Sequence, residues 1–266
     1  MKLAIIGCGK MGGALVKGVV AAGVVKSADV ALSDVYVPGR SQLAAALPGS
    51  REATSNLDAA AAADLVLLCV KPQEIPTVLA ELATLPRATL IVSIAAGVTL
   101  ARMEAVVQGR HRLIRVMPNT PALIGKGAAA FALGAAATED DAAAVTTLLA
   151  ATGLSVRVPE KLLDVVTGLS GSGPAYVYTV IEALADGGVL MGLSKEQALQ
   201  LAAQTVAGAA AMVLESGQHP AVLRDQVTSP GGTTIAGLAA LEDAGLRHAL
   251  ISAVKSATLR SQALGQ

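Results

Sequence analysis

The sequence predicts an α/β fold: a doubly wound parallel sheet in the N-terminal half, followed by an all-helical C-terminal half. Over residues 1–160, short apolar runs alternate with helical stretches, which is the pattern of a parallel sheet with helices on both faces. From Lys161 onward strand-like runs disappear and alanine-rich helical stretches take their place. Pro159 and Glu160 therefore mark a predicted boundary between domains 1–160 and 161–266.

The composition limits the classes of partner. Of the 266 residues 53% are hydrophobic and 2% aromatic, so the core must consist of Ala, Val, Leu and Ile. The formal net charge is zero, which argues against nucleic acid or an anionic membrane as the main partner. No apolar run reaches the ~18–20 residues that span a bilayer, and we recognise no targeting segment. We therefore expect a cytoplasmic protein.

The two cysteines predict neither a disulfide nor a metal site. Cys8 and Cys69 lie in or beside expected buried strands, and no Cys or His spacing typical of metal ligands surrounds them. We expect two small buried side chains in a reducing compartment, and no metal.

The N-terminus carries a dinucleotide-binding pattern. The apolar run MKLAIIG leads into GCGKMGGALVKGVVAAG, where Gly7, Gly9 and Gly12 have the G-x-G-x-x-G spacing and Gly23 ends the helix. The first glycine permits a tight turn, the second lets the backbone approach a pyrophosphate, and the third lets helix and strand pack closely. Free N–H groups at the helix N-terminus then face the phosphates. This context predicts a Rossmann-type domain.

The second apolar run, DVALSD, ends at Asp34, about 20 residues beyond the glycines, where an acid binds ribose hydroxyls. A solvated loop acid explains Asp34 equally well. Ser33 and Arg40 are near enough in sequence to meet a 2′-phosphate instead. The cofactor is therefore expected to be NADPH or NADH, with the choice open.

Further strand-like runs cover residues 64–70, 88–94 and 111–117, with helical stretches near 72–85 and 99–107 between them. Three distinctive loops follow these strands: CVKP, SIAAGV and RVMPNTP. Each alone could be ordinary turn chemistry. Because all three are expected at one sheet edge beside the glycine loop, we interpret them as the floor of the nicotinamide site.

The rest of the chain is predicted to be mainly helical. A weak strand after Lys126, a helix over 138–152 and the strand LSVRV complete the first domain. In the second, long helices begin near Pro174 and after Ser194. Small residues such as Ala207 and Gly208 permit close helix packing, inside the domain or between subunits, and we favour a subunit interface.

The stretch DQVTSPGGTTIAGL is richer in glycine and hydroxyl groups than a helix connection requires. Pro230 and the pair Gly231 and Gly232 interrupt the helices, and Thr233 and Thr234 stand where the next helix, over 235–244, begins. Such a helix start offers free N–H donors that can hold a carboxylate. A threonine cap after a Pro-Gly turn would explain only one threonine and one glycine.

These motifs together resemble the pyrroline-5-carboxylate reductase family. The resemblance covers nearly the whole chain and rests on IIGCGKMGGAL, CVKPQ, SIAAGV, RVMPNTP, GLSGSGPAYVY and DQVTSPGGTTIAGL. It implies NAD(P)H-dependent reduction of the cyclic imine Δ1-pyrroline-5-carboxylate to L-proline, the last step of proline biosynthesis. It also implies an interlocked dimer formed by the helical domain, assembled into a decamer of five dimers in some members.

The resemblance also implies roles for particular residues. The substrate carboxylate would lie on the turn Gly231, Gly232, Thr233 and Thr234, with the Thr234 hydroxyl near the ring nitrogen as the catalytic group. The active site would combine one subunit's cofactor domain with its partner's helical domain. Beyond Gly7, Gly12 and Asp34, the cofactor contacts would be Gly9, Lys10, Met11, Asn56, Val70, Lys71, Pro72, Ala96 and Gly97.

The chemistry needs no dedicated general acid, because a cyclic imine is readily protonated and its iminium is already electrophilic. His111, His219 and His248 lie away from the proposed loops and are expected to be surface or structural residues. Two other functions remain. A β-hydroxyacid dehydrogenase would need a lysine early in the second domain, yet no lysine lies between Lys161 and Lys195. A non-enzymatic dinucleotide-binding sensor would leave the threonine-rich turn without a purpose.

Overall fold

The computed structural model describes residues 1–265, and the chain divides into two compact units. The first unit is Met1–Ser172 together with the residues from Lys255 onward, and the second is Gly173–Val254. The boundary predicted from the sequence lies earlier, near Pro159 and Glu160. The first unit extends further because the segment after Glu160 packs on the sheet, where Leu163 is fully buried in the apolar core.

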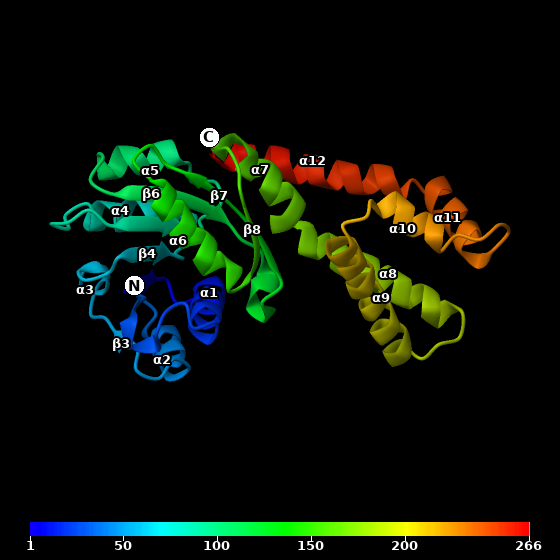
Figure 1. The fold of residues 1–266 in the computed structure, drawn as a ribbon, viewed down its shortest axis with the longest axis horizontal. Helices are drawn as coiled ribbons and strands as arrows, with labels where there is room; N and C mark the ends of the chain where they lie inside the picture. Colours follow the sequence, from blue (N-terminus) through cyan, green and yellow to red (C-terminus); the bar gives the residue numbers. More distant parts are fainter. Residues whose placement is uncertain (266) are drawn as a thin grey trace. The chain divides into compact units, whose positions relative to one another are not determined.

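The first unit is built on one sheet (Figure 1). Within the described residues, its strands have the order β3-β2-β1-β4-β5-β6-β7-β8. The strands from β3 across to β6 pair in parallel, which confirms the predicted doubly wound sheet. The chain moves outward from β1 in one direction and from β4 in the other, so the switch point lies between these two strands. The bounds are β1 Leu3–Ile6, β2 Val30–Ser33, β3 Arg51–Glu52, β4 Leu65–Leu68, β5 Leu90–Ser93, β6 Arg112–Met117, β7 Gly127–Leu133 and β8 Gly153–Arg157.

Alternating residues of the strands feed two separate apolar cores, one on each face of the sheet. In β1, Leu3 and Ile5 belong to the core that α1, α2 and α6 cover, whereas Ala4 and Ile6 belong to the core covered by α3, α4 and α5. Burial on both faces explains why the strands are continuous apolar runs. The helices are α1 Lys10–Ala21, α2 Val37–Ala45, α3 Asn56–Ala60, α4 Ile75–Leu82, α5 Leu100–Val107, α6 Glu139–Ala150 and α7 Leu163–Val166.

Two features of the sheet differ from what the sequence predicts. Strand β7 pairs antiparallel with β6, and β8 follows β7 in parallel, so the last two strands run opposite to the other six. The connection from β6 to β7 holds only the short 3₁₀ segment Thr120–Ile124, and a parallel crossover needs a longer connection. Strand β3 is missing from the sequence analysis because its two residues are exposed and form no apolar run.

The second unit is helical, as predicted. Ser194 caps α9 through its hydroxyl, which accepts from the Gln197 backbone N–H. Helices α8 and α9 approach closely at Gly188, where an added Cβ would lie 3.1 Å from the Cβ of Ala198. The helices are α8 Gly173–Leu190, α9 Lys195–Ser216, α10 Pro220–Gln226, α11 Thr233–Asp243 and α12 Leu246–Gly265, whose last residues belong to the first unit.

Helix α9 corrects one sequence-based expectation. By length and composition alone it is the one described helix apolar enough to cross a membrane, whereas the sequence analysis found no stretch of that length. A single such helix is weak evidence for a membrane span. Its surface is mostly exposed, so α9 presents apolar side chains that need a partner.

Candidate functional site

The three glycines of the N-terminal loop differ in what surrounds them. Gly7 has a φ of +99°, and a Cβ there would lie 2.6 Å from the Cys69 carbonyl carbon. A Cβ on Gly12 would overlap the Gly7 carbonyl oxygen. Gly9, the N-cap of α1, has nothing within 4 Å of the Cβ position. Gly7 and Gly12 are thus required by packing, whereas the space beside Gly9 is a cradle where a pyrophosphate can approach the backbone.

A cleft of about 510 Å³ lies at the carboxyl ends of β1, β2 and β4. It brings together Gly7, Gly9, Asp34, Asn56, Val70 and Lys71 from the predicted cofactor set. The other predicted cofactor residues, Lys10, Met11, Gly12, Pro72, Ala96 and Gly97, do not line it. Lys10 lines a neighbouring cavity of about 650 Å³, which shares Gly9 and Asp34 with the cleft.

Asp34 is held in place at the end of β2. One carboxylate oxygen accepts from the Cys8 backbone N–H at 2.6 Å, and the other accepts from the Tyr36 N–H at 2.8 Å. The neighbouring Ser33 hydroxyl donates to Asn56 Oδ1 at 2.8 Å, and Asn56 Nδ2 donates to Glu81 at 2.8 Å. These bonds fix the side chains at the β2 end of the cleft.

The two cysteines beside the glycine loop are inert. Burial, with a smaller contribution from Asp34, raises the pKa of the Cys8 thiol to about 12. Burial likewise raises the pKa of Cys69. Both thiols stay protonated at neutral pH, so neither is a nucleophile. Both are free cysteines, Cys8 buried and Cys69 half-buried.

Two of the motifs meet in the first unit. Asn119 of RVMPNTP donates from Nδ2 to the Ser170 carbonyl at 3.0 Å and accepts from the Ala128 N–H at 2.9 Å. A Cβ on Gly171 would lie 2.5 Å from the end of the Met117 side chain. The segment Thr167–Gly171 is a π-helical turn. The sequence analysis did not single out Asn119, although an amide in a Pro-Asn-Thr-Pro loop was a signal.

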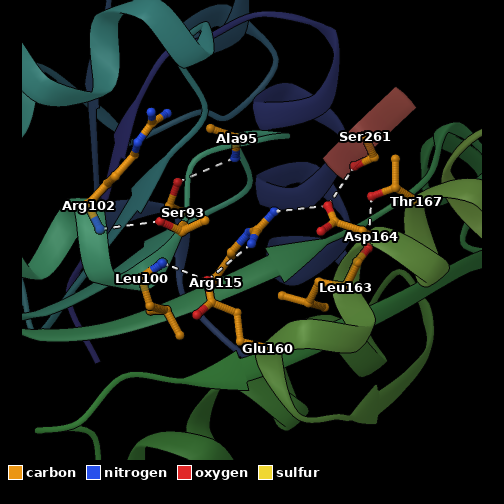
Figure 2. Close-up of polar contacts among 11 residues, drawn as sticks. Ser93, Ala95, Leu100, Arg102, Arg115, Glu160, Leu163, Asp164, Thr167 and Ser261 are labelled. Carbon is orange, nitrogen blue, oxygen red and sulfur yellow. Dashed lines mark hydrogen bonds and ion pairs between the residues drawn. The ribbon is translucent and has the colours of Figure 1, made fainter. Parts of the chain in front are cut away.

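A buried arginine connects four parts of the first unit (Figure 2). Arg115, in the middle of β6, pairs with Glu160 at 3.1 Å and with Asp164 at 3.9 Å. Glu160 also accepts from the Leu100 N–H at the start of α5 at 2.6 Å, and Asp164 accepts from the Ser261 hydroxyl of α12 at 2.7 Å. This network was not predicted from the sequence, although an arginine inside an apolar strand is unusual enough to mark it.

The end of α12 also contacts the SIAAGV loop. Gly97 has a φ of +76°, and a Cβ there would lie 3.5 Å from the Leu264 carbonyl oxygen. Ser93 supports the same loop, since its hydroxyl accepts from the Ala95 N–H at 3.3 Å (Figure 2). The network around Arg115 and the end of α12 therefore hold a loop that the sequence analysis assigns to the cofactor.

The glycine- and threonine-rich turn lies in the second unit. Gly231 has a φ of +67°, and Gly232 is the N-cap of α11 with no side-chain hydrogen bond to cap the helix. Helix α11 begins at Thr233, so both threonines lie in its first turn and neither is its cap. The Thr228 hydroxyl donates back to the Arg224 carbonyl at 2.7 Å. This turn therefore does not form the threonine cap considered above. The first N–H groups of α11 are suited to binding an anion.

The histidines have structural or surface positions. His111 is buried; its Nδ1 accepts from the Thr89 N–H at 3.2 Å and its Nε2 lies 2.8 Å from the Leu82 carbonyl oxygen. Burial lowers the pKa of His111, which keeps the ring neutral. His219 caps α10, and His248 is exposed. Among residues 1–265, no group of three His, Cys, Asp or Glu side chains could hold a metal ion.

Comparison with known proteins identifies two family models. The model described as pyrroline-5-carboxylate reductase dimerisation matches residues 160–264, and that described as NADP oxidoreductase, coenzyme F420-dependent, matches residues 2–97. The first match shows that the helical part of the chain belongs to a domain that self-associates.

Relatives and solved structures extend this similarity over the whole chain. A pyrroline-5-carboxylate reductase of Methanosarcina acetivorans is 47% identical over 100% of this chain and 98% of its own length. One of Arabidopsis thaliana is 45% identical over 100% of this chain and 96% of its own length. The structure of a pyrroline-5-carboxylate reductase from Coxiella burnetii has a TM-score of 0.94 at 34% identity. The match covers 100% of this chain and 98% of that chain. A Plasmodium falciparum pyrroline carboxylate reductase with NADP bound has a TM-score of 0.87 at 32% identity, also covering 100% and 98%.

A 3-hydroxyisobutyrate dehydrogenase of Mycobacterium tuberculosis shares the fold alone, at 19% identity and a TM-score of 0.51. The relatives at 45–47% identity, by contrast, match this chain from end to end in both of its units. The chain therefore belongs to the pyrroline-5-carboxylate reductase family.

Proposed function

We propose that this chain reduces Δ1-pyrroline-5-carboxylate to L-proline with NADPH or NADH, the last step of proline biosynthesis. The observation that carries the proposal is the full-length similarity to pyrroline-5-carboxylate reductases, which includes both the cofactor cleft and the Pro-Gly-Gly-Thr-Thr turn. The open space beside Gly9 supports the cofactor half of the proposal. On this view residues 1–160 bind the cofactor, and residues 161–266 bind the substrate and form the dimer.

The cofactor, when bound, would supply a hydride for reduction of the imine. The chain's own residues hold the reactants. The backbone N–H groups beside Gly9 hold the pyrophosphate, with further contacts from Lys10, Met11, Asn56, Val70, Lys71, Pro72, Ala96 and Gly97. Because the imine carbon of the protonated ring is already electrophilic, positioning supplies most of the acceleration, up to roughly 7–11 kcal/mol in the best cases.

The substrate half of the site is the turn Gly231, Gly232, Thr233 and Thr234. The N–H groups at the start of α11 hold the carboxylate, because they lack a capping side chain and lie at the positive end of an 11-residue helix. The Thr234 hydroxyl, half-buried in the first turn, binds near the ring nitrogen. We expect this turn to act with the cofactor cleft of a partner subunit, in a dimer and in a decamer of five dimers.

The proposal also covers where the enzyme works. We expect a cytoplasmic enzyme, and its formal net charge of zero favours a small-molecule partner over nucleic acid or a membrane. The apolar surface of α9 then serves self-association. A β-hydroxyacid dehydrogenase is disfavoured because Lys195 lies on the surface in an ion pair with Asp186.

Steady-state reduction of Δ1-pyrroline-5-carboxylate, with NADH and NADPH in parallel, tests the reaction. Cofactor binding without turnover of this imine would contradict it and favour a sensor, whereas oxidation of small hydroxy acids would favour the dehydrogenase.

Thr234→Ala tests the turn. We expect kcat/KM to fall about 10- to 100-fold, the effect of losing a hydrogen bond to a charged group, with unchanged cofactor affinity. Thr179→Ala is the matched control, because the Thr179 hydroxyl bonds only within α8, to the Ala175 carbonyl. Normal turnover in Thr234→Ala would remove this hydroxyl from the mechanism.

A further inference from the structure

The cofactor cleft has an unequal distribution of charge. Three carboxylates line this cleft, those of Asp34, Glu74 and Glu81, against one cationic side chain, that of Lys71. The two forms of the cofactor differ here by one group, the 2′-phosphate of the adenosine ribose, which carries about −1.5 to −2 charges at neutral pH. Building on the proposed function, we propose that this cleft selects NADH over NADPH and that Asp34 is the specificity-determining residue.

Asp34 has the acceptor capacity that a ribose diol requires. A carboxylate offers about four lone-pair positions. The Cys8 N–H at 2.6 Å and the Tyr36 N–H at 2.8 Å each occupy one, on different oxygens. One position then remains on each oxygen, which matches the two hydroxyl donors of an unphosphorylated ribose. The two backbone bonds also fix the carboxylate before the cofactor arrives.

The groups that could have received a 2′-phosphate are occupied. Arg40 Nε pairs with Glu52 at 3.0 Å, and Arg40 Nη1 donates to the Ala53 carbonyl at 3.2 Å. Arg40 is also absent from the lining of the cleft. The Ser33 hydroxyl is buried and donates to Asn56 rather than toward the cleft.

The remaining cation does not reverse this balance. Lys71 shares the cleft with Glu74, whose carboxylate accepts from the Lys71 backbone N–H at 3.2 Å, and with Glu81. A 2′-phosphate would therefore add negative charge to a cleft with excess negative charge, and it would take away the hydroxyl donor that Asp34 binds.

The test is a fluorescence titration of the full-length protein with NADH and with NADPH, without any imine. We expect NADH to bind at least about 10-fold more tightly, the size of one charged hydrogen bond. Asp34→Asn keeps one acceptor oxygen, and Asp34→Ser removes both. Each should weaken NADH and bring the two dissociation constants to within about threefold, a difference of less than 1 kcal/mol. Asp140→Asn, which removes an acid on α6 outside the cleft, is the control and should keep the original ratio.

Equal or tighter binding of NADPH by the unmodified protein would overturn the inference. So would an unchanged preference in both Asp34 variants, provided that circular dichroism shows them folded. Because no imine is present, the result is separate from the proposed reaction: tight NADH binding without imine reduction would support the selectivity and contradict the reaction. Binding of neither nucleotide would contradict both.

Discussion

The two units of the chain bury their apolar residues in different ways. In the first unit, leucine, isoleucine and valine fill a core on each face of the sheet. In the second, the buried apolar residues among those described are three alanines, Ala185, Ala198 and Ala202, while Leu190 is 84% and Leu214 75% exposed. The first unit is therefore stabilised mainly by its own packing. The second has the composition of a core that only another copy completes, which agrees with its match to a dimerisation domain.

The largest expected effect separates packing from ligand binding inside the first unit. Gly9→Val should abolish measurable NADH and NADPH binding, because its side chain would fill the pyrophosphate cradle, where an added Cβ has no protein atom beyond its chain neighbours within 4 Å. Gly12→Ala, the matched variant, should instead lower the free energy of unfolding by about 1–3 kcal/mol, because its Cβ meets the Gly7 carbonyl. Titration of both variants with NADH and NADPH measures cofactor binding, and thermal unfolding of both measures stability. Normal cofactor affinity in Gly9→Val would contradict the assigned role of the cradle.

The next effect tests how the first unit holds the end of α12. Arg115→Ala leaves Glu160 and Asp164 without their cation, and we expect a loss of about 2–4 kcal/mol in the free energy of unfolding. The exposed pair of Arg157 with Glu139 supplies the control, since Arg157→Ala should cost less than about 1 kcal/mol. Urea unfolding measures both, and equal losses would show that burial of Arg115 is unimportant.

A smaller effect is expected at the surface of the second unit. Leu201 on α9 is 58% exposed and lines a groove with Leu193, Ala207 and three glutamines of the same helix. Leu201→Glu should raise the dissociation constant for self-association about 10- to 100-fold, the equivalent of one buried leucine. Sedimentation velocity at decreasing concentrations measures this. Leu154→Glu on β8, where the leucine is 61% exposed, should leave self-association unchanged. A larger effect of Leu154→Glu than of Leu201→Glu would contradict the assignment of self-association to the second unit.

The smallest effect is a pH dependence confined to the first unit. Burial lowers the pKa of His111, so the folded chain keeps this ring neutral while the unfolded chain protonates it below about pH 6.5. The contribution of neutral His111 to the free energy of unfolding is therefore complete above that pH. It is lost as the pH falls toward the lowered pKa of the folded state.

We expect Tm to decline between pH 7 and pH 5, by about 2–4 °C for each kcal/mol lost, and the decline to be weaker in His111→Gln. His248→Gln, at an exposed position, should keep the slope of the unmodified protein. A pH profile of Tm that is identical in all three proteins would contradict the assignment to His111.

Much of the fold followed from local patterns. The apolar runs of β1, β4 and β5 are continuous because both faces of the sheet are buried, so the sequence itself marks them. The start of α6 at Thr138 and the cap of α9 at Ser194 were also recognisable, because capping involves residues only three apart. The residues of the candidate site could be proposed for the same reason, because the glycine loop and the Pro-Gly-Gly-Thr-Thr turn are each one continuous stretch of sequence.

What the sequence alone determined are features set within a few residues of one another, namely the strand and helix alternation, the glycine loop and the helix starts. Only the tertiary structure decided the reversed direction of β7, the ion pairs of Arg115 with Glu160 and Asp164, and the pairing of Arg40 with Glu52. Each of these joins groups far apart in sequence or depends on which strand becomes a neighbour. No local period encodes such choices, because the energy of a buried charge or a strand pairing depends on the partner that folding brings to it.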